Sequence, residues 1–344
     1  MAYKHFLLAA LLPLAACGGG DGTNPINNEG GTTAEPGILP GTNNPSSNRG
    51  ITRYEAEDGT GSGYAREISY DSGADTFSVN NLAFDGDNTY GRSSNPQLQD
   101  LSADPATVFA VYEGNGIEND PLTGDPINQF EYRALYARSK NTTAGGAART
   151  EFAIVRTGSY TGYGFGGFLY QRNEGVNLPS AGQATYSGNY AAIRDFAGAG
   201  GLEYAVGDMT MDIDFRDFDE GEGVKGRVYN RRILDSNGND VTANMITALQ
   251  AEYGGTYSAL PELRLVVQPG VLDRNGEITG SVNSTILNGD GEQETYESGA
   301  YYALVSGRDA DEVVGILTVQ AADARQQGVT ARETGGFILY RPNP

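Results

Sequence analysis

From residue 182 to residue 341, hydrophobic and polar positions alternate with a period of two, the repeat of a β-strand whose faces differ in environment. The stretch MTMDIDF is a clear case, because Met209, Met211, Ile213 and Phe215 fall on one face and polar side chains on the other. Gly, Asn, Asp and Ser residues interrupt the pattern about every ten residues, as turns do. The pattern predicts antiparallel strands that bury one face and expose the other.

Eight strands are predicted in this part of the chain, at 184–194, 206–217, 222–231, 262–268, 275–284, 294–306, 311–320 and 334–341. Glycine normally weakens a strand, so its repeated use here indicates tight bends in a strongly coiled sheet. The glycines concerned are Gly188, Gly226, Gly280, Gly299, Gly315 and Gly335. Eight coiled antiparallel strands suit a small closed barrel that is filled by its own side chains.

The alternation also assigns single side chains to the inside or the outside of this barrel. In the third strand it places Val228 inward and Arg231 outward, and in the fourth strand it places Leu265 and Val267 inward. Because closure leaves no strand edge that needs a partner, we expect the barrel to fold on its own.

One stretch has a helical pattern, DVTANMITALQAEY at 240–253, in the long connection between the third and fourth strands. Met245, Ile246 and Leu249 share one side of this helix. Two readings of the helix remain open: it carries an exposed apolar patch for a partner, or it closes the mouth of the barrel.

A long insertion in a compact barrel is more often functional or mobile than a plain connector. The connection 232–261 is therefore the candidate partner-binding loop, with the acidic residues Asp235 and Asp240 beside the apolar side of the helix. A second candidate is the loop 321–333.

The region 51–178 has strand patterns of its own, at 75–85, 106–113, 129–139 and 150–172. The chain is thus predicted to be all-β, with an N-terminal antiparallel sheet over 51–178 followed by a C-terminal eight-stranded antiparallel β-barrel over 179–344.

The first 50 residues have the pattern of an exported, lipid-anchored protein. Lys4 precedes a short apolar run that ends in Ala15-Ala16-Cys17, too short to cross a bilayer but typical of a signal peptide over 1–16. Cys17 is then the predicted site of lipid attachment, because several acyl chains hold a protein firmly on a membrane. The Gly- and Asn-rich segment that follows predicts a disordered tether, so that 17–50 is anchor and tether.

Composition removes most kinds of chemistry. The chain has 44 acidic against 23 basic residues, a formal net charge of −21, so nucleic acid is not an expected partner. Its one histidine, His5, lies in the predicted signal peptide, Cys17 is its one cysteine, and it has no tryptophan. Ser-His-Asp and Cys-His catalysis and His/Cys metal sites are therefore excluded. No metal or cofactor is expected, although calcium with oxygen ligands stays open.

Two motifs resemble ligand sites without their full pattern. GYGFGG at 162–167 matches a dinucleotide motif, but a strand rather than a helix is predicted after it. DSNGND at 235–240 resembles a calcium loop, but it lacks the glycine at position 6 and the glutamate at position 12 of an EF-hand. Both are predicted to be ordinary β-ribbon or turn.

The barrel region resembles the transferrin-binding protein B-like family of surface lipoproteins. The resemblance rests on Leu178-Pro179 followed by Thr185-Tyr186-Ser187-Gly188, on the turn Gly307 to Val313, and on the closing strand from Glu333 to Phe337. It implies a handle sheet over 51–178 packed against the barrel. One handle and barrel pair is predicted here, whereas the family's namesake has two.

The resemblance implies a non-catalytic, surface-exposed outer-membrane lipoprotein that binds a macromolecular or metal- or haem-carrying partner, with a TonB-dependent receptor as a further expected partner. The alternatives are a structural or adhesive surface module and, less favoured, a carboxylate- or calcium-dependent hydrolase. With its strongly acidic composition, the chain is expected to attract a basic partner.

Overall fold

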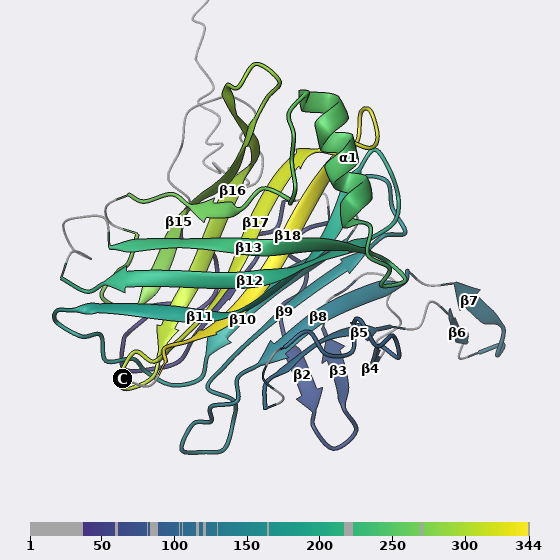
Figure 1. Cartoon of the computed structure of the whole chain (residues 1–344). Helices are drawn as coiled ribbons and strands as arrows, with labels where there is room; N and C mark the ends of the chain where they lie inside the picture. Colours follow the sequence, from purple (N-terminus) through teal and green to yellow (C-terminus); the bar gives the residue numbers. More distant parts are fainter. Residues whose placement is uncertain are drawn as a thin grey trace, which may run out of the picture.

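The computed structural model describes residues 37–342, apart from short gaps at 59–60, 81, 83–88, 103, 105, 115–116, 120–121, 129, 164, 217–222 and 269–270. The predicted signal peptide, Cys17 and the first part of the predicted tether lie outside the described residues. Figure 1 shows a closed β-sheet packed beside a curved open one, with a helix at one end of the closed sheet.

The C-terminal part is a closed eight-stranded antiparallel barrel, as the alternation predicts. Its strands are β11 (Gln183–Ala197), β12 (Glu203–Asp214), β13 (Val224–Asp235), β14 (Leu263–Leu265), β15 (Glu277–Leu287), β16 (Gln293–Ser306), β17 (Glu312–Ala322) and β18 (Thr330–Tyr340). β11 pairs with β18 to close the barrel. The fold class is confirmed.

The N-terminal part is an eight-stranded antiparallel sheet with the order β1-β10-β9-β8-β5-β4-β3-β2. Its strands are β1 (Ile51–Tyr54), β2 (Ile68–Asp71), β3 (Thr76–Val79), β4 (Tyr90–Arg92), β5 (Val108–Glu113), β8 (Tyr132–Arg138), β9 (Thr150–Thr157) and β10 (Gly166–Arg172). β6 (Ile117–Asn119) and β7 (Pro126–Asn128) form a separate two-stranded hairpin. We call the eight-stranded sheet the handle sheet.

Short strands of the handle sheet were harder to predict than the barrel. The predicted strand 150–172 is two strands, β9 and β10, and the three short strands β1, β2 and β4 were not predicted. The GYGFGG motif runs into β10, a strand, as expected for a ribbon rather than for a dinucleotide site.

The segment 37–50, which the sequence assigns to the tether, lies against the handle sheet. The N–H of Thr42 donates to the carbonyl of Thr52 at 3.0 Å, and the N–H of Val176 donates to the carbonyl of Ser47 at 2.7 Å. Backbone hydrogen bonds of this kind offset the conformational entropy that the segment loses when it becomes ordered, a cost that its composition alone predicts it cannot meet. The predicted tether boundary at residue 50 is therefore too late.

Two consecutive glycines on β18 show how the barrel is packed on both sides. A Cβ on Gly335 would lie 2.2 Å from the ring of Tyr190 inside the barrel. A Cβ on Gly336 would lie 2.1 Å from the ring of Phe152 on the handle sheet. Each glycine therefore leaves room for an aromatic ring, one in the barrel core and one between the two sheets.

The handle sheet and the barrel share an apolar core. Phe109, Leu135 and Ile154 of the handle sheet form one buried cluster with outward-facing barrel residues such as Ile316 and Ile338. The sequence analysis predicts barrel strands with one exposed face, but part of the outer barrel surface is buried here. Several barrel strands therefore bury both faces over part of their length.

The helix α1 (Thr242–Tyr253) closes a gap in the barrel wall. β14 has three residues and makes two residue pairs with β13 and two with β15, so the ends of β13 and β15 near α1 diverge. Because β14 ends at Leu265, Val267 is 41 % exposed, which corrects its predicted inward position. Within the described part of the chain, no helix is long and apolar enough to span a membrane.

Candidate functional site

The predicted partner-binding loop forms one end of the barrel, which we call the helix end. Met245 and Leu249 of α1 are buried in the barrel core, and Ile246 is partly buried against the same core. These three side chains, for which an exposed apolar patch and a plug of the barrel mouth were both left open, therefore pack inward. Of the two readings left open, this placement agrees with a helix that closes the barrel mouth.

The two acidic candidates lie together in the turn that leads into α1. One carboxylate oxygen of Asp235 accepts the backbone N–H groups of Asn237 at 2.9 Å and Asn239 at 2.8 Å, and Asp240 accepts the N–H of Thr242 at 2.9 Å. Hydrogen bonding from Asn239 lowers the pKa of Asp235. The carboxylates therefore stabilise a turn, and the calcium hypothesis for this turn stays untested.

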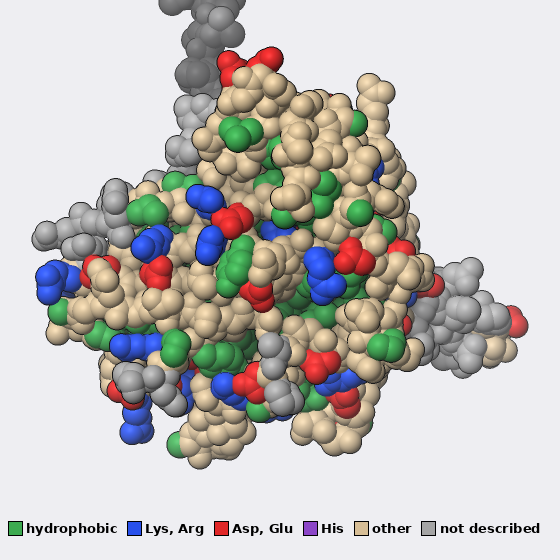
Figure 2. All heavy atoms as spheres, in the orientation of Figure 1, with side chains coloured by type: hydrophobic (Ala, Val, Ile, Leu, Met, Phe, Trp, Pro, Cys, Tyr) green, Lys and Arg blue, Asp and Glu red, His purple; other side chains and the backbone are tan. Residues whose placement is uncertain are grey.

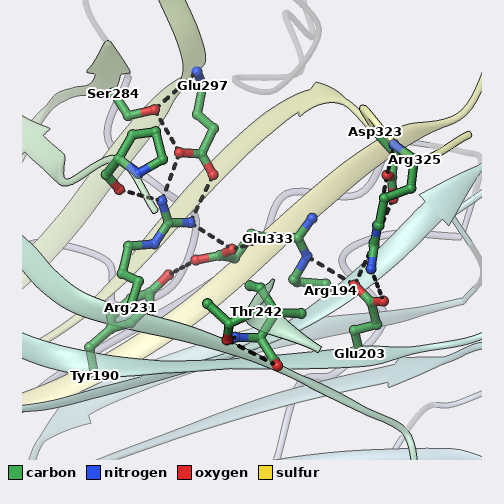
Figure 3. A network of polar contacts seen from close by, with 12 residues as sticks. Tyr190, Arg194, Glu203, Arg231, Thr242, Ser284, Glu297, Asp323, Arg325 and Glu333 are labelled. Carbon is green, nitrogen blue, oxygen red and sulfur yellow. Dashed lines mark hydrogen bonds and ion pairs between the residues drawn. The ribbon is translucent and has the colours of Figure 1, made fainter. Parts of the chain in front are cut away.

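Beneath the helix end lies a buried network of charged side chains centred on Arg231 (Figure 3). Its guanidinium donates to both carboxylate oxygens of Glu297 at 2.8 Å and to Glu333 at 2.9 Å. It also donates to the carbonyl of Pro261 at 2.9 Å, in the segment that returns from α1 to β14. One arginine thus connects β13, β16, β18 and the chain behind the helix.

The period-two alternation predicts Arg231 on the outside of the barrel, but its side chain is buried inside, which corrects that prediction. The register between β12 and β13 shifts between Val206 and Asp208, and Asn230 has a φ of 52°. A bulge adds one residue to a strand and moves the residues beyond it to the other face. The prediction failed only at the bulge, because assigning alternate residues of a strand to opposite faces assumes that the strand contains no extra residue.

The other members of the network occupy inward positions that counting does find. Tyr190 on β11 donates its hydroxyl to Glu333 at 2.9 Å, and Ser284 on β15 donates to Glu297 at 2.6 Å. Glu333 lies two residues before the inward-facing Gly335, so its position could have been predicted. The signal that could have revealed the network is therefore a charge at an inward position of a strand.

A second group of ion pairs holds the other candidate loop, 321–333. The guanidinium of Arg325 donates to both oxygens of Glu203 at 2.6 and 2.9 Å and to Asp323 at 2.7 Å. Arg194 links this group to the first, because it lies 3.5 Å from Glu203 and 3.3 Å from Glu333 (Figure 3). Bidentate pairs of this kind fix geometry as well as charge.

The carboxylates of the network have no free acid–base role. Burial raises the pKa of Glu297, but the charge of Arg231 and its hydrogen bonds outweigh burial and leave the pKa below its usual value. Burial would likewise lower the pKa of Arg231, but Glu297 and Glu333 hold it well above its usual value. Both carboxylates are buried and occupied by the arginine, so they do not form the open pair that a glycosidase presents to its substrate.

The exposed surface of the helix end is acidic. The tip of the β15–β16 hairpin carries Asp290, Glu292 and Glu294, all exposed, beside Glu252 of α1. Figure 2 shows acidic side chains at the top of the molecule, where this hairpin projects. The stretches 236–258 and 287–294 contain no lysine or arginine. This surface therefore carries a negative charge that its own elements leave unbalanced.

Contacts between the two elements hold this surface in place. The N–H of Gly289 donates to the carbonyl of Tyr253 at 2.8 Å, and the hydroxyl of Tyr257 donates to the carbonyl of Leu287 at 2.7 Å. The ring of Tyr296 meets that of Tyr253 edge to face at 6.0 Å. Leu287, on the same hairpin, is 58 % exposed. The arrangement is an acidic face that these contacts hold in place, with one exposed apolar side chain on its hairpin.

Within the described ranges, no group of three or more aspartate, glutamate, cysteine or histidine side chains is placed so that it could hold a metal ion. The expectation that the protein needs no metal or cofactor stays a prediction. Cys17 lies outside the described residues.

No family model matches the sequence, and no curated protein matches it. Among solved structures, the chain is similar to a double mutant of transferrin-binding protein B from Haemophilus parasuis Hp5, with 12 % identity and a TM-score of 0.35 over 86 % of this chain and 52 % of that one. It is also similar to intact transferrin-binding protein B with N and C lobes (12 % identity, TM-score 0.32, 86 % and 53 % coverage).

A further similar structure is a mutant of transferrin-binding protein B from Actinobacillus pleuropneumoniae H49, at 11 % identity and a TM-score of 0.28, over 59 % of this chain and 80 % of that one. The chain spans about half the length of the first two structures. The curled handle sheet and the closed eight-stranded barrel agree with the single handle and barrel pair predicted from the sequence.

Proposed function

We propose that this protein is a lipid-anchored outer-membrane protein, facing the cell exterior, that binds a macromolecular partner through the helix end of its barrel without catalysing a reaction. The observation that carries the proposal is the acidic face formed by α1 and the β15–β16 hairpin. The buried Arg231 hydrogen-bonds to the carbonyl of Pro261, and the partly buried Arg325 pairs with Glu203, so the loops behind this face are held in one arrangement. A preordered surface binds with a smaller entropic cost than a flexible one.

The charge of the face indicates the kind of partner. Four exposed carboxylates on elements that contain no lysine or arginine favour a partner with a basic patch, and opposite charges accelerate encounter at low salt. Following the predicted anchor and the family resemblance, we propose a protein that carries a metal or haem as the partner, and a TonB-dependent receptor as the next component. These identities rest on resemblance alone.

The test begins with capture of partners from the native environment by the full chain, followed by mass spectrometry. Binding of the captured protein is then compared for the parent, for Asp290→Lys with Glu292→Lys on the acidic face, and for the matched control Asp309→Lys with Asp125→Lys away from it. We expect the first pair to slow association at least tenfold and the control pair to change it little.

Two results would count against the proposal. If both charge-reversed pairs slow association equally, only the overall charge of the chain matters and the helix end is not the binding face. If no protein is captured, and the chain instead promotes adhesion of the cells that display it, the alternative of an adhesive surface module is favoured.

A further inference from the structure

A groove separates the handle sheet from the barrel, away from the acidic face. It consists of two adjoining cavities of about 490 and 360 Å³ that share Ser102 and Asn189 as lining residues. One wall is the connection between β4 and β5, and the floor is formed by β11, β12 and β13. Lining side chains from both sides include Gln97, Asp100, Ser102, Asn189, Asp208 and Asn230.

The groove is a defined feature of the fold and not an incidental space between loops. Its wall is held in place because Leu98 is buried, and the backbone N–H of Val111 donates to the carbonyl of Leu98 at 2.9 Å. Asn95 of the same wall donates its side-chain amide to the carbonyl of Asn237 on the barrel. The wall is therefore fixed to both the handle sheet and the barrel.

The floor of the groove contains the bulge of the β12–β13 pair. Asn230, with its φ of 52°, donates its side-chain amide to Asp208 at 2.7 Å, and both line the groove. Non-glycine residues in this backbone region are uncommon and gather at functional sites, and bulges re-aim side chains beside such sites. The bulge that turns Arg231 inward thus also sets the polar floor of the groove.

The lining chemistry excludes several classes of ligand. Four carboxylates and three cationic side chains line the two cavities, so the groove has no excess of positive charge for a polyanion. The lining is mostly polar, which does not suit a lipid or haem. The floor strands belong to the closed barrel, so they offer no free edge to an added peptide strand.

A polyhydroxylated ligand fits what remains. Each hydroxyl group both donates and accepts hydrogen bonds, and amide and carboxylate side chains provide both functions along the groove. At one end, the ammonium of Lys140 lies 4.5 Å from the ring centre of Tyr340 and 2.5 Å from Asp104. From this lining we infer that the groove between the handle sheet and the barrel binds a saccharide.

A saccharide can come from a glycoprotein or from the lipopolysaccharide of a membrane, and the experiment separates these sources. The full chain is applied to an array of free oligosaccharides and, in a second arm, to vesicles that contain purified lipopolysaccharide. Binding to array glycans alone indicates glycoprotein glycans, and binding to the vesicles indicates lipopolysaccharide. Either result supports the inference. Polyphosphate and a peptide array serve as probes of the other ligand classes.

Three variants tie the binding to the groove. Asn189→Leu places an apolar side chain where the two cavities meet, and Gln97→Trp narrows the groove from its exposed wall. The second variant keeps the test valid if the first does not fold. Thr185→Leu, on the same strand as Asn189 but outside the groove, is the matched control. We expect at least a tenfold loss of saccharide affinity in the first two and little change in the control.

Three results would overturn the inference: no glycan or lipopolysaccharide is bound; binding is equal in the Gln97→Trp variant and the parent; or polyphosphate or peptides are bound in preference to glycans. The charge-reversed pair at the helix end, Asp290→Lys with Glu292→Lys, lies outside the groove lining. Saccharide binding that persists in this variant, with partner binding lost, separates this inference from the proposed function.

Discussion

Replacing Arg231 by methionine is the sharpest test of the network beneath the helix end. Methionine keeps much of the side-chain volume but removes the cation that binds Glu297, Glu333 and the carbonyl of Pro261. Removing one partner of a buried ion pair costs about 3–5 kcal/mol, because it leaves a buried charge unpaired. Because domains are stable by only about 5–15 kcal/mol, this is a large part of the free energy of unfolding.

The predicted loss depends on pH, and its sign follows from the carboxylates. In the parent, the charge of Arg231 keeps the pKa of Glu297 below its usual 4.5, so the stabilisation is present above that pH and is lost as pH falls. Without the arginine, burial raises the pKa of Glu297 above its unfolded value. Stability of the variant then falls as pH rises through that raised range. The difference between parent and variant should shrink from pH 7 to pH 5.

Urea unfolding followed by tyrosine fluorescence measures this, since the chain has 21 tyrosines and no tryptophan. The matched control is Arg227→Met on the same strand, whose side chain is 49 % exposed and pairs with Glu262 at 3.0 Å. Exposed pairs contribute about 0–1 kcal/mol, so the control should change little. A loss below about 1 kcal/mol for Arg231→Met, or one that does not vary with pH, would refute the reasoning.

Three further predictions concern the interface and the anchor. Burial raises the pKa of Glu312, against hydrogen bonds from Thr150, Asn141 and Ser139, so stability should fall as pH rises above 4.5; melting temperatures of Glu312→Gln measured across pH 4–7 should lack this decline. Although strand closure alone predicts a barrel that folds on its own, the handle sheet buries part of its outer face, so the fragment 179–344 should show a β-sheet circular dichroism signal but aggregate or melt without cooperativity; a cooperative melt of soluble fragment would contradict the shared core. Cys17→Ala should abolish palmitate labelling and release the protein from membranes, and unchanged labelling would disprove the predicted anchor.

The barrel could be predicted from sequence because its strands are long and their alternation is regular. All eight predicted ranges overlap an observed strand, and the inward set Met209, Met211 and Ile213 is buried. The handle sheet was predicted only in part, since strands of three or four residues such as β2 and β4 carry too few positions to establish a period.

The candidate site was predicted less well, for reasons that concern long-range contacts. The apolar side of α1 was recognised, but whether it faces solvent or the barrel depends on the gap left by the three-residue strand β14. Arg231 was assigned to the wrong face because one bulge shifts the register. The groove is lined by segments that lie about a hundred residues apart in the sequence, such as those of Gln97 and Asn189. No local sequence pattern can therefore predict it.

The handle sheet and the barrel are best understood as one folded body. Closure removes the free edges of the barrel but does not make its outer face polar, and Ile316 and Ile338 on that face are buried against the handle sheet. Polar contacts then fix how the two parts meet: Arg53 forms a bidentate pair with Glu277 across the interface, at 2.7 and 2.8 Å. Burial of apolar surface stabilises the contact between the handle sheet and the barrel, and the bidentate pair of Arg53 and Glu277 forms in only one relative orientation of the two. We therefore expect that the two parts do not slide relative to each other. A groove at their junction is therefore as rigid as the barrel itself, which is the condition for selective recognition of a small polar ligand.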